Sequence, residues 1–184
     1  MKKLSLNSWK AWVFTAALAA LSIILTRFAS INIGTTVRIG FGRLPIMLAS
    51  AWFGPVLGAI CGGAADIIGA LMSTGWNPLL TVPAVVCGII PFFLFWAFRV
   101  RSTVSGKKEI RANIFKVGAS VVITKVITQG IIMTLLLAYV FKQTPVQLMT
   151  SLGIRNLITV GEAIVETAAI YMLYTNKAIN RIIR

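Results

Sequence analysis

The chain has 184 residues, of which 58% are apolar, and its mean hydropathy is +0.88. A core of this length cannot hide so much apolar surface, so the composition excludes an ordinary soluble domain and indicates an integral membrane protein. The formal charge of +14 does not indicate nucleic-acid binding, because the basic residues lie in short segments between long apolar runs.

The ionisable side chains restrict the chemistry further. The chain has no histidine, two cysteines and only four acidic residues. A His- or Cys-based metal site cannot be assembled from this set, and a histidine base or paired acids with metal-ligand spacing, which we would expect of a lipid-modifying membrane enzyme, are missing. We therefore expect no enzyme activity, no metal and no cofactor. Cys61 and Cys87 fall in apolar runs and are predicted to be buried free thiols.

The first apolar run, residues 11–31, has about the twenty residues that a helix needs to cross about 30 Å of hydrocarbon. It carries Ala16 and Ala20, spaced i and i+4, which form a flat small-residue stripe where another helix could pack.

A long loop over residues 32–43 follows, with Arg38 and Arg43 on either side of Phe41, and Arg27 lies near the end of the run before it. Arginines near a bilayer need water, lipid headgroups or an anion. We interpret this outer loop as the lid and anion clamp of a ligand pocket, with headgroup binding as the alternative.

Five further apolar runs give six predicted spans in total. They cover residues 11–31, 44–53, 56–73, 79–98, 117–141 and 146–174. The second is short, about 15 Å as a helix. In the third, Gly58 and Gly62 fit the small-xxx-small pattern that lets helices approach closely.

Charge decides the expected orientation. The N-terminal segment, a basic linker over residues 99–116 and the C-terminal segment hold 12 of the 18 basic residues, and they share one side only if an even number of spans separates them. The fold class is therefore all-α integral membrane, with six transmembrane helices, cytoplasmic termini and a long first outer loop over a ligand pocket. Residues 1–184 form a single domain without an internal repeat.

Polar residues inside apolar spans are candidates for a binding site. The predicted ligand-binding set is Arg27, Arg38, Phe41, Arg43, Asp66, Trp76, Asn77, Gln129, Arg155, Asn156 and Glu162. Alternatives remain open: Lys125 with Glu162 or Glu166 could be an interhelical ion pair, Trp76 could be an interface anchor, and Arg155 could bind a backbone carbonyl. Arginines at the mouth and carboxylates below would suit an elongated ligand with an anionic tail and a polar heterocyclic head.

The whole pattern resembles the substrate-binding S component of an energy-coupling factor (ECF) vitamin transporter. The segments LTRF, VRIGFGRLPI and GPVLGAICGGAADIIGALM are most similar to folate-specific members. The resemblance implies a folate-binding subunit in a bacterial cytoplasmic membrane, in contact with lipid, which works with a transmembrane coupling subunit and two cytosolic ATPases. It also implies that Ala16 and Ala20 form the docking surface. The chain itself contains no Walker-type loop.

The resemblance implies that Arg27, Arg38 and Arg43 bind the glutamate tail of folate or form the lid. It also implies that the buried head of folate is bound by Asp66, Gln129, Arg155 and Glu162. Another cargo (riboflavin, thiamine, pantothenate or a queuosine precursor) would fit the same class, although arginine-rich lips disfavour cationic thiamine. A membrane enzyme acting on lipid and a purely structural subunit are the competing classes.

Overall fold

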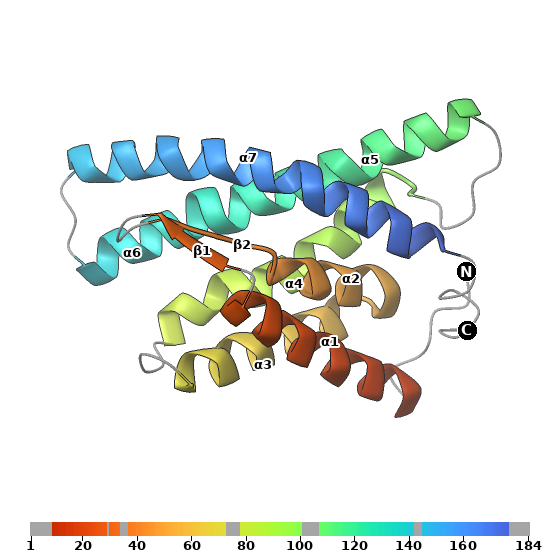
Figure 1. Ribbon diagram of the computed structural model, residues 1–184, viewed down its shortest axis with the longest axis horizontal. Helices are drawn as coiled ribbons and strands as arrows, with labels where there is room; N and C mark the ends of the chain where they lie inside the picture. The colour runs from red at the N-terminus through yellow and green to blue at the C-terminus, as the bar shows by residue number, and fades with distance from the viewer. Residues whose placement is uncertain are drawn as a thin grey trace.

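The computed structural model describes residues 9–28, 30–33, 37–72, 78–100, 107–141 and 145–176, with the backbone alone at 30–33, 37–39, 107–108, 141, 145–152 and 154–155 (Figure 1). The elements in chain order are α1 (Trp9–Phe28), β1 (Ser30–Ile33), β2 (Val37–Gly40), α2 (Arg43–Phe53), α3 (Pro55–Leu71), α4 (Pro78–Ala97), α5 (Lys107–Lys125), the π-helical segment η1 (Val126–Ile132), α6 (Met133–Phe141) and α7 (Pro145–Thr175).

The helices form six units, because α5, η1 and α6 follow one another without a break. Within the described residues, four stretches are long and apolar enough to cross a membrane: Trp9–Phe28, Pro78–Ala97, Glu109–Val140 and Asn156–Thr175. The apolar helix α3 is shorter, and α2 has 11 residues. The predicted six-helix architecture is confirmed; the cytoplasmic location of the termini stays a prediction.

The helices form two groups, which Figure 1 shows as an upper and a lower layer. α7 lies along α5 and η1, whereas α1, α2, α3 and α4 pack on one another. Contacts of α2 and α4 with the upper elements join the two groups. Cys61 and Cys87 are buried and free, as the sequence predicted.

The segment predicted as an outer loop over residues 32–43 contains part of an antiparallel β-hairpin. Ser30 lies opposite Gly40, and Ile33 lies opposite Val37. The β-branched residues in SINI and VRIG alternate with other types, which favours strands. Arg43 belongs to the next helix, which begins one residue earlier than predicted.

The basic linker is also shorter than expected. We expected residues 99–116 to connect two spans, but α5 begins at Lys107, so the second half of this segment is helical. Lysine, arginine, alanine and glutamate favour helix, and Glu109 in the first turn complements the positive end of the helix dipole.

Helices α3 and α4 approach each other backbone to backbone, which confirms the prediction from the small-residue pattern. A Cβ added at Gly58 would lie 2.1 Å from the Gly88 carbonyl oxygen, and one added at Gly62 would lie 2.2 Å from that of Ala84. Next to this contact, the Phe92 N–H donates to Ser50 Oγ of α2 (3.2 Å). Only glycine allows this spacing at the two α3 positions.

Replacing Gly58 by alanine is therefore expected to destabilise the protein by about 3 kcal/mol, because the new methyl group meets backbone that cannot rotate away. Gly69→Ala on the same helix is the matched control, because a Cβ there meets nothing within 4 Å. Thermal unfolding in detergent should show a lower Tm for Gly58→Ala only. Equal Tm values for the two variants would contradict the close approach.

Helix α1 has a buried face and an exposed face. Ala11, Thr15, Ala19 and Ser22 are buried, and the hydroxyl of Ser22 donates to the Gly42 carbonyl (2.6 Å) at the entrance to α2. Ala16 and Ala20 lie on the other face and are exposed. The small-residue stripe is thus accessible from outside the described helices.

Candidate ligand-binding site

A buried ion-pair group joins α5 to α7. Lys125 Nζ lies 2.6 Å from Glu162 Oε2 and 3.0 Å from Glu166 Oε1. Glu162 and Glu166 are spaced i and i+4, so both carboxylates point from one face of α7 toward the last residue of α5. All three side chains are buried. Of the alternatives left open by the sequence, the structure contains the interhelical ion pair.

Glu162 also holds the hairpin. The backbone N–H of Gly40, the last residue of β2, donates to Glu162 Oε1 (2.9 Å), while the second carboxylate oxygen accepts from Lys125. Both oxygens therefore have partners inside the fold. This geometry gives Glu162 a positioning role between the hairpin and the ion-pair group, and Gly40 is a residue that the sequence did not indicate.

Arg43 adds a second cation to the interior. It is the first residue of α2, and its Nη1 donates to the carbonyl of Pro83 in α4 (3.1 Å). This hydrogen bond gives the guanidinium a partner inside the fold, whereas the buried charge of Lys125 is balanced by Glu162 and Glu166.

Arg27 and Phe41 lie close to the hairpin. The guanidinium of Arg27 donates to the Gly69 carbonyl, near the end of α3, where helix carbonyls have no partner within the helix. Phe41 is half-buried between β2 and α2, and its carbonyl accepts from the Leu44 N–H (3.1 Å). Within the described residues, Arg27 thus bridges two helices.

The π-helical segment η1 brings Gly130, the neighbour of Gln129 in the chain, against Asn156 of α7. η1 packs on α7, and a Cβ added at its Gly130 would lie 2.0 Å from Asn156 Oδ1. π-Helical turns inside α-helices are frequent at functional sites. The sequence signal is the run ITQG in the middle of an apolar span. The structure therefore places Asn156 against η1, and Gln129 is the residue of η1 that precedes this contact in the chain.

Several buried side-chain oxygens on α6 and α7 have no hydrogen-bond partner among the described residues. They are Thr134 Oγ1, Asn156 Oδ1 and both carboxylate oxygens of Glu166, although Glu166 lies within ion-pair distance of Lys125. Unpartnered polar atoms cost free energy when buried, and a polar ligand with N–H or O–H groups could satisfy them. Thr134, on α6, was not among the predicted residues.

The remaining predicted residues are not part of this group. Asp66 is half-buried on α3, which packs mainly on α1, α2 and α4, and among the described residues its carboxylate has no ion pair with a predicted arginine. Arg38 and Arg155 are placed by backbone alone, in β2 and α7. Trp76 and Asn77 lie outside the described residues.

Comparison with solved structures defines the class of protein by its fold. A crystal structure of FolT bound with folic acid matches with a TM-score of 0.70 over 92% of this chain and 95% of that one, at 22% identity. The structure of the S component of a bacterial ECF transporter matches with a TM-score of 0.65 over 95% and 98%, at 17% identity. The chain therefore has the fold of a membrane-embedded S component.

The family follows from the sequence model of the ECF-type riboflavin transporter S component, which matches residues 6–178. The chain belongs to this family of transporter subunits, is a multi-pass membrane protein and is not an enzyme. A curated relative, the folate transporter FolT of Clostridium novyi (strain NT), is 32% identical over 102 residues, 54% of this chain and 56% of the relative. The match thus spans about half the length of that relative.

Proposed function

We propose that the protein is the folate-binding S component of an ECF importer in a bacterial cytoplasmic membrane. The main evidence that the transported vitamin is folate is the 32% identity to the Clostridium novyi folate transporter. The likeness of the fold to FolT bound with folic acid agrees with it. Because the matching family model is named for riboflavin, riboflavin is the runner-up.

The polar contact between η1 and α7 supports this cargo. Folate has a flat head rich in hydrogen-bonding groups and a glutamate tail with two carboxylates. We place the head against Gln129, Thr134 and Asn156, where buried oxygens have unused acceptor capacity. Arg38, on β2, is the proposed partner of the tail, since guanidinium groups bind carboxylates bidentately, and Arg155, on α7 next to Asn156 in the chain, stays with the head.

The hairpin is the proposed lid over this ligand. Its described anchor is the hydrogen bond from Gly40 to Glu162, which in turn is held by Lys125. A lid that depends on few contacts can open without unfolding the helices beneath it. Glu162 would therefore act on ligand binding through the position of the hairpin.

The coupling subunit and two ATPases are the proposed partners. The exposed Ala16 and Ala20 stripe on α1 supports a docking surface there, because small side chains let a second helix approach closely within lipid. Neither alanine is covered by a described helix.

Calorimetric titration of the detergent-purified protein with folic acid, riboflavin and pantothenate tests the cargo. We expect one-to-one binding of folic acid alone. Gly130→Ala should weaken it about tenfold or more, because the new Cβ displaces Asn156. Gly161→Ala on α7 is the control, because a Cβ there meets nothing within 4 Å.

The other outcomes separate the alternatives. Binding of riboflavin or pantothenate in place of folic acid would overturn the cargo and leave the family. Equal affinities in the two glycine variants would move the ligand away from the η1–α7 contact.

A further inference from the structure

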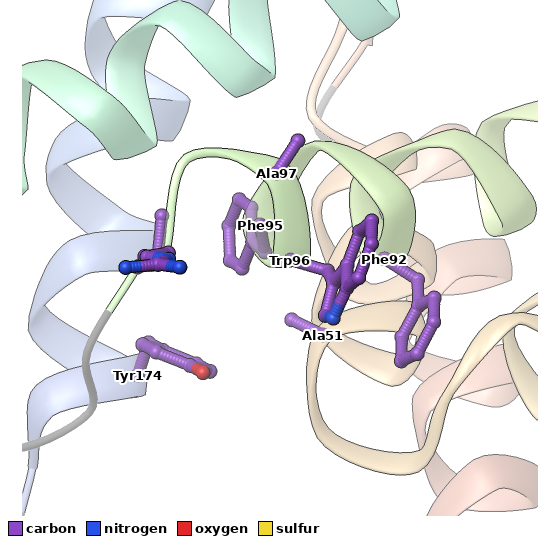
Figure 2. A pocket seen from close by; sticks show the side chains of 8 residues that line it. Ala51, Phe92, Phe95, Trp96, Ala97 and Tyr174 are labelled. Atoms are coloured by element: carbon purple, nitrogen blue, oxygen red, sulfur yellow. The ribbon is translucent and has the colours of Figure 1, made fainter.

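A second site lies at the far end of α4, away from the hairpin. A cavity of about 460 Å³ opens there between α2, α4 and α7 (Figure 2), within the size range of pockets that bind small molecules. Its lining includes Phe92, Phe95, Trp96, Arg99, Val100 and Tyr174. Tyr174 lies twelve residues beyond Glu162 on α7, about 18 Å along the helix, so this cavity is separate from the proposed folate site.

The cavity has an apolar wall and a charged rim. Phe95, Val100 and Tyr174 are buried, and the rings of Phe95 and Tyr174 meet edge to face at 5.5 Å. Trp96 is 75% exposed, and Arg99 is exposed as well. No acidic residue contributes to the described lining. The site therefore presents the positive charge of Arg99 beside an apolar surface.

The backbone at Arg99 is unusual. α4 ends in a Schellman motif, in which the Arg99 N–H donates to the Trp96 carbonyl (3.2 Å) and the Val100 N–H donates to that of Phe95 (2.9 Å). Such a motif requires a left-handed residue, and Arg99 has a φ of 49°. Glycine adopts this conformation freely, whereas a residue with a side chain is strained in it.

The two hydrogen bonds of the motif explain the left-handed backbone at this position, but they do not require an arginine side chain there. Within the part of the chain that the structure describes, the Arg99 guanidinium makes no ion pair and no hydrogen bond. Strained residues cluster at binding sites, where the side chain has a task that the backbone alone does not explain. An unpaired guanidinium at the rim of a cavity is suited to bind an anion.

We propose that this cavity binds an anionic phospholipid of the surrounding bilayer. Arg99 contacts the lipid phosphate, and the glycerol and upper acyl chain lie along Phe92, Phe95 and Trp96. The cavity lies where the spanning helix α4 ends, which is the depth of the lipid headgroups, and tryptophan and tyrosine are enriched at that depth.

Charge complementarity favours this occupant over others. The segment that follows α4 is rich in lysine and arginine, and such clusters next to a span attract anionic lipids. Arginine binds phosphate in a planar, bidentate way. A free phosphate would leave the aromatic wall exposed to water. A phospholipid covers this wall with its acyl chain and also pairs its phosphate with the Arg99 guanidinium. This inference does not depend on which vitamin the protein binds.

The test uses the purified full chain and dioctanoyl-phosphatidylglycerol, with binding followed by native mass spectrometry. Dioctanoyl-phosphatidylcholine and glycerol 3-phosphate are the comparison probes. We expect saturable binding of the phosphatidylglycerol, about tenfold weaker binding of the other two, and about tenfold weaker phosphatidylglycerol binding in Arg99→Gly. The Tm of Arg99→Gly should be no lower than that of the wild type, because glycine relieves the strained φ.

Arg111→Gln is the matched control, since Arg111 is an exposed basic residue on α5 and does not line the cavity. It should bind phosphatidylglycerol as the wild type does. Equal losses of phosphatidylglycerol binding in Arg99→Gly and Arg111→Gln would show a diffuse effect of positive charge. Unchanged binding in Arg99→Gly would show that the lipid does not bind at this cavity. Either result overturns the proposal. Tight binding of glycerol 3-phosphate would assign the site to a soluble phosphate. If the wild type bound no phosphatidylglycerol and Arg99→Gly lost binding of the coupling subunit, the site would belong to a protein partner.

Discussion

Replacing Lys125 by methionine is expected to destabilise the protein by about 3–5 kcal/mol. The ammonium group lies between the carboxylates of Glu162 and Glu166, and its side chain is fully buried. Removing it leaves two buried carboxylates without the cation that both of them face. Methionine has a similar length, so packing changes little and the loss reports the charge.

A compensating variant isolates this mechanism. Adding Glu162→Gln and Glu166→Gln to Lys125→Met removes all three charges, and most of the lost stability should return, because neutral groups cost far less to bury. Lys116→Met is the matched control on the same helix. Lys116 is half-buried and makes no ion pair among the described residues, so its replacement should cost about 0.5 kcal/mol or less.

Thermal and denaturant unfolding in detergent would measure these differences. A Lys125→Met protein as stable as the Lys116→Met protein would mean that the ion-pair group does not contribute to stability. If the triple variant were no more stable than Lys125→Met alone, the loss would come from packing and not from unpaired charge.

Replacing Ala16 or Ala20 by tryptophan is expected to abolish vitamin uptake while leaving binding to the isolated subunit unchanged. Both alanines are on the exposed face of α1, which packs mainly on α2 and α3, whereas the proposed ligand contact lies between η1 and α7. A tryptophan there keeps a partner helix several ångströms away, which removes the close packing that holds helices together in lipid. Uptake of labelled folate by vesicles that contain the whole transporter, together with calorimetry on the subunit, separates the two effects.

Ala17→Trp is the control for this experiment. Ala17 is also exposed, but it lies about 100° around the helix from Ala16, on the side where the large residue Leu21 is already exposed. It should keep most of the uptake. Loss of uptake in Ala17→Trp as well would indicate a general insertion defect, and loss of folate binding in Ala16→Trp would contradict a docking role.

The spans were predictable because bilayer thickness imposes length and apolar composition directly on local sequence. The close contact of α3 with α4 was predictable for a similar reason, since Gly58 and Gly62 are near neighbours in the chain. The hairpin was missed because its strands are only four residues long and follow an apolar run that reads as helix. The helical start at Lys107 was missed because a cluster of basic residues between two apolar runs predicts a polar connection and hides the helix propensity of lysine and arginine.

The candidate site was predictable only in part. Polar residues inside apolar runs identified Gln129, Asn156 and Glu162, and the structure places all three on η1 or α7. Their partners could not be read from the sequence, because Lys125 is 37 residues from Glu162, and Gly40 is 122 residues from it. The partner of Arg27 could not be predicted either. It is a backbone carbonyl, which every residue has, so the residue type gives no sign of it.

The sequence by itself determined that the protein lies in a membrane, that it has six helices and that its interior holds a few charges that need partners. These properties depend on composition and on spacing within single helices, where the physics is local. Only the tertiary structure decided how the charges pair, that Glu162 holds the hairpin, and that Arg99 takes a left-handed backbone at the rim of the cavity between α2, α4 and α7. Such features depend on which distant segments meet, and packing of the whole chain sets those distances.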